Sequence, residues 1–186
     1  MTDRAPVKPG SATDQSSAPR PEVLPDQDHG TVNVVELSQY IVLTAKKSFL
    51  GTIDKSTDHP HVSLVAVATT RGGVPVFLLS SLARHTQNLL ENPKVSVFFD
   101  ATGDSDDVMA GDRITVFGTI IPLDNGDDQA EIRDRFLSNH PTAIQYIDFS
   151  DFRFYKLCPE SAHFVGGFGR IVEIAGQDLV KRSDGR

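Results

Sequence analysis

The sequence predicts a mainly β (α+β) domain in which six to seven antiparallel strands close into a barrel with two or three flanking helices. Two observations lead to this prediction. The middle of the 186-residue chain alternates short runs of β-branched and aromatic residues with turn signals. The connections between these runs are mostly too short for the crossovers of a parallel sheet, which favours hairpins and a closed antiparallel sheet.

Length and composition indicate one globular domain between two polar ends. Residues 1–30 are rich in proline, serine and aspartate and lack apolar periodicity, so we expect a disordered N-terminal tail. The folded domain is expected at residues 31–175, and residues 176–186 are expected to form a polar C-terminal tail. An apolar content of 39%, with 11 phenylalanines, is sufficient for a packed core.

Charge and targeting signals narrow the possible partners and location. A net charge of −7 argues against nucleic acid, whose phosphates are met by basic surfaces. No secretory signal or membrane-spanning run is present, and the single Cys158 suits a reducing compartment. We therefore expect a soluble, cytoplasmic protein that binds neither nucleic acid nor membrane.

The first half of the domain is expected to contain one helix followed by strands. Apolar residues at helical spacing predict a helix over 34–46. Runs of β-branched residues predict strands at Phe49–Ile53, His61–Thr69 and Val74–Leu79, and the segment Asp54–Pro60 between the first two is expected to be a polar loop.

The second half is expected to add four strands and a helix. Strands are predicted at Val95–Phe99, Arg113–Ile121, Phe152–Leu157 and Ala162–Val165, with Pro159 separating the last two. Capping and acidic residues at the start of Asn125–Leu137 predict a helix there.

The stretch after Leu79 predicts a short helix with an unusual first turn. Ser80 or Ser81 is expected to cap it, Leu82, Leu89 and Leu90 to form its buried face, and Pro93 to end it. Cations at a helix N-terminus oppose the helix dipole.

A bound phosphate would reverse that unfavourable effect. Arg84, His85, the two serines and the free N–H groups together resemble an anion site, with Asn88 one turn further on. The alternative is that Arg84 and His85 are simply solvated.

Several motifs in order resemble the pyridoxamine 5′-phosphate oxidase-like, FMN-binding split-barrel superfamily, and within it the haem-utilisation branch. The resemblance covers roughly residues 34–174 and is carried by FLGTI at 49–53, HPHVS at 59–63, FLLSSLARHTQNL at 77–89, NP at 92–93, RITVFG at 113–118 and GGFGR at 166–170.

The resemblance implies a split β-barrel and an FMN-dependent oxidoreductase. It implies that the protein is a homodimer with FMN at the subunit interface, and that Arg84 and His85 hold the FMN phosphate. Arg113 would lie near the flavin ring and tune its potential, and Ser63 and Val65 would line the ribityl chain. An arginine that pairs with the neighbouring acidic loop is the alternative for Arg113. No catalytic acid or base and no physiological substrate can be assigned from the sequence.

Two other functions stay open. The first is haem binding or degradation, although the additional C-terminal region that carries the haem-ligand histidine of that branch has no counterpart here, which leaves His163 or an external ligand. The second is a non-catalytic split-barrel binding protein. No histidine pair has the spacing of a helical metal site, so no metal site is expected.

Overall fold

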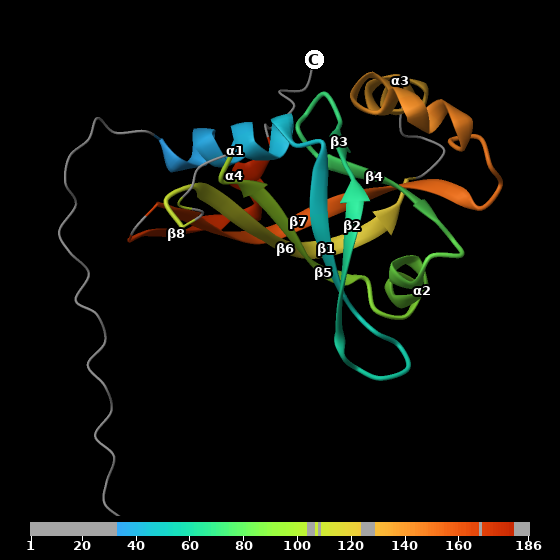
Figure 1. Ribbon diagram of the computed structural model, residues 1–186, viewed down its shortest axis with the longest axis horizontal. Coiled ribbons are helices and arrows are strands. Elements are labelled where there is room, and N and C mark those ends of the chain that lie inside the picture. Colours follow the sequence, from blue (N-terminus) through green and yellow to red (C-terminus); the bar gives the residue numbers. More distant parts are fainter. Residues whose placement is uncertain (1–32, 104–106, 108, 124–128, 168, 181–186) are drawn as a thin grey trace, which may run out of the picture.

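The computed structural model describes residues 33–103, 107, 109–123, 129–167 and 169–180, which form a curled sheet with flanking helices (Figure 1). In chain order the elements are α1 (Val34–Thr44), β1 (Lys47–Ile53), β2 (Pro60–Ala66), β3 (Ala68–Thr69), β4 (Pro75–Ser80), α2 (Arg84–Glu91), β5 (Lys94–Ala101), β6 (Asp112–Pro122), α3 (Gln129–Asn139), the 3-10 helix η1 (Pro141–Gln145), β7 (Phe152–Gly166), β8 (Arg170–Ala175) and α4 (Gly176–Leu179).

The strand order forces the sheet to curl. The order is β2-β1-β5-β6-β7-β4-β3, and every pairing is antiparallel. Strands β2 and β3 lie at opposite ends of this order, yet only Val67 separates them in the chain. The two ends of the sheet are therefore held together, which confirms the predicted mainly β antiparallel barrel.

Strand β7 is where the barrel splits. One edge pairs with β6 along most of its length, whereas the other pairs with β4 over Phe152–Lys156 and with β8 over Ser161–Gly166. The sequence predicted two strands separated by Pro159. The structure joins them, because a bulge lets Pro159 pair with Gly118, while residues 157–160 pair with no described strand on the edge opposite β6.

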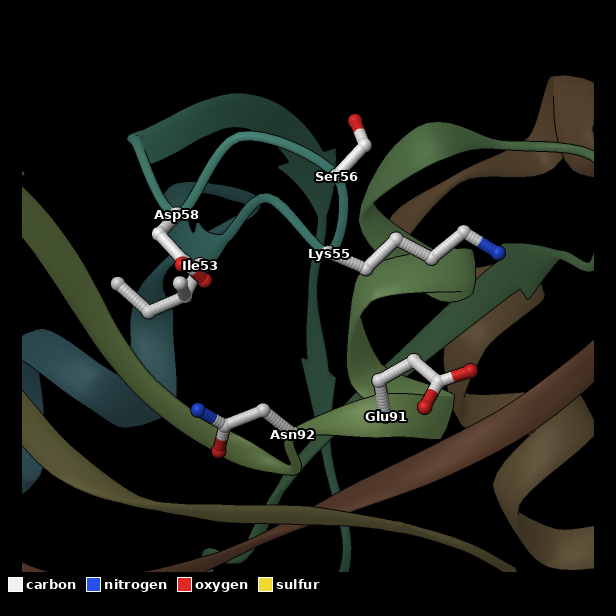
Figure 2. Close-up of a pocket in the computed structure, with 6 residues that line it drawn as sticks. All are labelled: Ile53, Lys55, Ser56, Asp58, Glu91 and Asn92. Carbon is white, nitrogen blue, oxygen red and sulfur yellow. The ribbon is translucent and has the colours of Figure 1, made fainter.

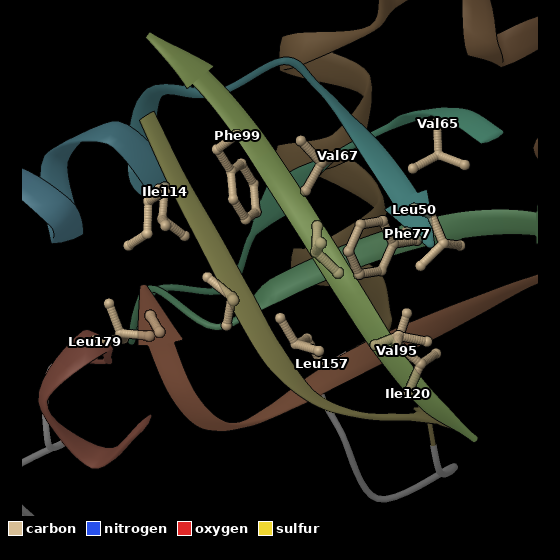
Figure 3. Close-up of a cluster of buried hydrophobic side chains, with 14 of the residues drawn as sticks. Leu50, Val65, Val67, Phe77, Val95, Phe99, Ile114, Ile120, Leu157 and Leu179 are labelled. Carbon is tan, nitrogen blue, oxygen red and sulfur yellow. The ribbon is translucent and has the colours of Figure 1, made fainter. Parts of the chain in front are cut away.

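The main core fills the barrel (Figure 3). Its largest fully buried side chains come from β1, β4, β5, β6 and β7 and include Leu50, Phe77, Phe99, Ile114 and Leu157. Helices α1 and α4 close one end, since Ile41, Val42 and Leu179 belong to this core. Folded structure thus extends to Leu179, beyond the boundary expected at residue 175.

A second apolar cluster lies outside the barrel, under α3. Phe136 and Ile132 of α3 pack on Val76 and Leu78 of β4, so this part of the sheet is buried on both faces. Among the described helices, none covers the outer face of β1, β2, β5 and the β7–β8 hairpin in the way that α3 covers β4, and Phe49, Leu64 and Phe117 stay exposed there.

The helices differ in detail from the prediction. Leu82, which precedes α2, and Leu90 within the helix are exposed, whereas Thr86, Asn88 and Leu89 are buried. In the described part of the chain α3 begins at Gln129, and the residues before it that were expected to start the helix lie outside the described residues, as does the expected tail at 1–30. No helix among the described residues is long and apolar enough to cross a bilayer.

Candidate functional site

The first turn of α2 is held by an ion pair. Arg84 Nε donates to Asp54 Oδ2 at 2.5 Å, and the Asp54 side chain is almost completely buried while that of Arg84 is largely exposed. The carboxylate therefore supplies the negative charge that favours a cation at this helix start. The pKa of Asp54 is held far below its ordinary value, chiefly by Arg84, and that of Arg84 is raised by the same contact.

Asp54 also organises the loop between β1 and β2. Its Oδ1 accepts hydrogen bonds from the main-chain N–H and hydroxyl groups of Ser56 and Thr57. Asn88 extends the network, because its amide donates to Thr52 and accepts from the N–H of Lys55. The sequence predicts a polar loop in this segment, and an aspartate followed by hydroxyl residues two and three positions later is the signal of such a turn.

Ser80 and Ser81 also take part in hydrogen bonds. Ser80 Oγ donates to Asp151 Oδ2 at 2.5 Å and accepts from the N–H of Leu82, and the carbonyl of Ser81 accepts from Gln87. Neither caps α2, whose N-cap is Ala83. The residues expected to form an anion site thus lie close together, but Arg84 is paired with Asp54 and Ser80 with Asp151.

His85 faces a second imidazole rather than a second cation. It is half-buried, and its pKa is lowered by burial and by the nearby His61. His61 Nε2 lies 3.3 Å from the hydroxyl of Ser63. Val65 points inward and is buried in the barrel core, so it cannot line a ligand exposed at the surface.

A shallow cleft of about 500 Å³ lies beside α2, between the β1–β2 loop and the C-terminal end of the helix (Figure 2). Its rim carries one cation, Lys55, and two anions, Asp58 and Glu91. In Figure 2 the Lys55 side chain extends from the β1–β2 loop across α2, and Glu91 lies below it near the end of that helix. The mixed charge does not favour a phosphate, which needs an excess of cations.

The outer side of the sheet offers a different surface, which we call the outer apolar face. Register places Leu64, Phe49 and Phe98 side by side on β2, β1 and β5, with Phe49 and Phe98 ring centroids 6.2 Å apart. The neighbouring row adds Val62 and Phe117. All except Phe98 are exposed, an unusual concentration of apolar groups at a surface.

The row through Phe98 continues into a polar pair. Thr115 of β6 is opposite Phe98, His163 of β7 is opposite Thr115, and Glu173 of β8 is opposite His163. His163 Nδ1 lies 2.5 Å from Glu173 Oε1. Arg113, two residues before Thr115, shares this face and donates to the carbonyls that precede β6.

Comparisons with known proteins place these features in a family. A family model described as CREG, β-barrel matches residues 30–181. The chain is 38% identical over 113 residues to the chloroplastic heme oxygenase HOZ of Arabidopsis thaliana, a match that covers 61% of this chain and 34% of the relative. It is 32% identical over 139 residues to the heme oxygenase HutZ of Vibrio cholerae, covering 70% and 75% of the two chains.

A solved structure is also similar to this chain. The heme binding protein from Mycobacterium smegmatis is 29% identical, with a TM-score of 0.73 over 81% of this chain and 61% of that one. This chain thus spans about a third of the Arabidopsis relative and about three fifths of the mycobacterial chain. The split-barrel fold and the closeness to the haem branch are supported.

The expectation that the cofactor is FMN is contradicted. The two heme oxygenases and the mycobacterial heme binding protein are named for haem, not for a flavin. The structure supplies a physical reason, because the guanidinium expected to bind the flavin phosphate is already paired with Asp54. Among the described residues no group of three or more histidine, cysteine or acidic side chains could hold a metal ion directly.

Proposed function

Because this chain belongs to the CREG β-barrel family, with heme oxygenases among its relatives, we propose that it binds haem and supports its oxidative degradation. The observation that carries the proposal is the 32% identity to HutZ over three quarters of that protein. Haem degradation is an oxidation, so the protein is proposed to be an oxidoreductase that binds haem.

The outer apolar face suits a porphyrin. A porphyrin is planar and largely apolar, and the exposed ring of Phe49 together with Phe98 offers a flat aromatic surface of the same kind. The propionates of haem need cations, and Arg113 lies on this side of the sheet. Haem iron, when bound, supplies the oxygen chemistry. The residues of this chain bind the ring, orient it and exclude water from it.

We propose in addition that two copies of the chain pack through the outer apolar face. One open sheet covers only one side of a planar ligand. A second copy would cover the other side and remove the exposed side chains of Val62, Leu64 and Phe117 from water. The haem would then lie at the edge of the interface.

The test is a titration of the purified full-length protein with hemin, followed by its absorbance in the Soret region. We expect saturable binding in a one-to-one ratio per chain. Phe98→Glu should weaken it, because the substitution places a charge in the aromatic row, whereas Ile144→Glu, on exposed η1, should not. A protein that shows no saturable Soret change would contradict the proposal.

Degradation is tested on the loaded protein. With ascorbate as reductant, oxygen present and catalase added, the Soret band should decay while iron is released and a linear tetrapyrrole appears. A stable Soret band under several reductants would favour the other function that the sequence left open, a binding protein without catalysis.

A further inference from the structure

Five histidines lie in the described part of the chain, and four of them are poorly placed to reach a ligand on the outer apolar face. His140 Nε2 is 3.0 Å from a main-chain carbonyl, and its ring packs on a phenylalanine. His61 and His85 lie together beside α2. His59 lies in the β1–β2 loop. His163 is the histidine that shares a register row with Phe98.

The contact with Glu173 fixes which nitrogen of His163 carries a proton. An ionised carboxylate can only accept hydrogen bonds, so Nδ1 must be the donor. The neutral imidazole then carries its lone pair on Nε2. Among the described residues no hydrogen bond to Nε2 is found, and the side chain is 38% exposed.

We propose that His163 is the axial ligand of haem iron in this chain, through Nε2, and that Glu173 is a positioning residue that holds its imidazole. This inference rests on the haem binding proposed above. A histidine that binds a metal through one nitrogen usually donates the other N–H to a carboxylate or carbonyl, which sets the tautomer and makes the ligating nitrogen more basic. His163 and Glu173 have this arrangement.

The surroundings of His163 fit a haem bound there. Two strand spacings of about 4.8 Å separate it from Phe98, a distance that a porphyrin centred on His163 can bridge. Thr115, between them, is small enough to lie beneath the ring. Arg113 is opposite Val165, two residues from His163 on the same face, and a guanidinium is well suited to pair with a propionate.

The test compares four full-length proteins: the wild type, His163→Ala, His163→Met and the control His59→Ala. Hemin affinity should fall by at least about tenfold in His163→Ala, the size of loss seen when metal ligands or their partners are removed. Imidazole added to that variant should restore the histidine-ligated absorption and electron paramagnetic resonance spectra. His163→Met should bind hemin with a different ligand signature, and His59→Ala should match the wild type.

The positioning role of Glu173 needs a separate measurement. Glu173→Gln should keep His163 as ligand but lower the iron–histidine stretching frequency of the ferrous protein in resonance Raman spectra, because a neutral amide makes the imidazole less basic. Glu160→Gln, at an exposed glutamate on β7, the strand that carries His163, is the control and should leave this frequency unchanged.

The outcomes separate the two proposals. If the wild type does not bind hemin, both fail. If the wild type binds hemin and His163→Ala, shown to be folded by circular dichroism, gives the same ferric and ferrous spectra, haem binding stands and the assignment of His163 is overturned. If His163→Ala loses the spectrum and Glu173→Gln leaves the iron–histidine frequency unchanged, the positioning role of Glu173 is overturned.

Discussion

At the scale of single residues, Asp54 links a loop to a helix. Its buried carboxylate accepts from Arg84 and from the loop hydroxyl and N–H groups, so the β1–β2 loop and the start of α2 are held by one side chain. Losing either partner would leave polar groups without partners in a buried place. This explains the basic first turn of α2 without a ligand.

Asp54 should make the free energy of unfolding depend on pH in the acid range. Its folded-state pKa lies below its ordinary value of 3.8, so the unfolded chain binds this proton first. The stabilisation is fully present above pH 3.8 and is lost progressively as the pH falls from there towards the folded-state pKa. We expect Asp54→Asn to be less stable than the wild type at pH 7 and to lose less stability between pH 5 and 3, measured by chemical denaturation.

The matched control is Asp58→Asn. Asp58 lies in the same loop with a left-handed backbone (φ 58°), which asparagine also tolerates. This variant should stay close to the wild type at pH 7. An Asp54→Asn protein with the acid sensitivity of the wild type would contradict the role of the carboxylate.

His85 should act in a different pH window. Its pKa is lowered by burial and by His61, so the unfolded chain takes up the proton at a higher pH than the folded protein does. Stability linked to His85 is therefore lost as the pH falls below about 6.5. In NMR titrations the His85 ring should titrate below that value, and His61→Gln should raise its midpoint. A midpoint at or above 6.5 would refute this.

At the scale of elements, much of the sheet could be predicted from sequence, because strands form where β-branched and aromatic residues recur between turns. Strands β1, β5 and β6 overlap the predicted ranges. The buried face of α2 could not be predicted from its leucines, because the network around Asp54 buries Asn88 while Leu82 stays in water. A tertiary contact overrode the local apolar pattern.

The candidate site was harder to predict than the sheet. His163 and Glu173 are ten residues apart in sequence, and only the β7–β8 pairing makes them neighbours. The sequence predicts no strand at β8, so it gives no signal that Glu173 lies beside His163. The sequence predicts separate strands on either side of Pro159, but a bulge places this residue where it pairs with Gly118.

That bulge depends on the absence of a side chain at Gly118. A Cβ there would collide with the carbonyl of Cys158 on β7. We expect Gly118→Ala to lower the free energy of unfolding by about 1–3 kcal/mol, as overpacking does, measured by urea denaturation. Gly51→Ala is the control, since its nearest neighbour is the hydroxyl of Ser96, which can rotate away. Equal losses in both variants would show that the bulge does not set the cost.

At the scale of the whole molecule, the sheet is covered unevenly, and this predicts how copies of the chain associate. Helix α3 buries the outer side of β4, whereas the outer apolar face is left open. We expect the wild type to sediment as a dimer at micromolar concentration and Leu64→Asp to sediment as a monomer, because the aspartate would have to lose its hydration in the interface. Ile144→Asp, at an exposed site on η1, should remain dimeric. A monomeric wild type would contradict packing through this face.

The pairing of β4 with β7 also has a consequence during synthesis. Val76 pairs with Lys156, so the edge of β4 has no partner until the ribosome has made most of the chain. Synthesis proceeds at about 5–20 residues per second. The strand that carries Phe77 and Leu79 therefore stays without its β7 partner for several seconds after it has been made. Cellular yield should therefore depend on chaperones that shield nascent chains, even though the finished barrel buries these residues completely or nearly so.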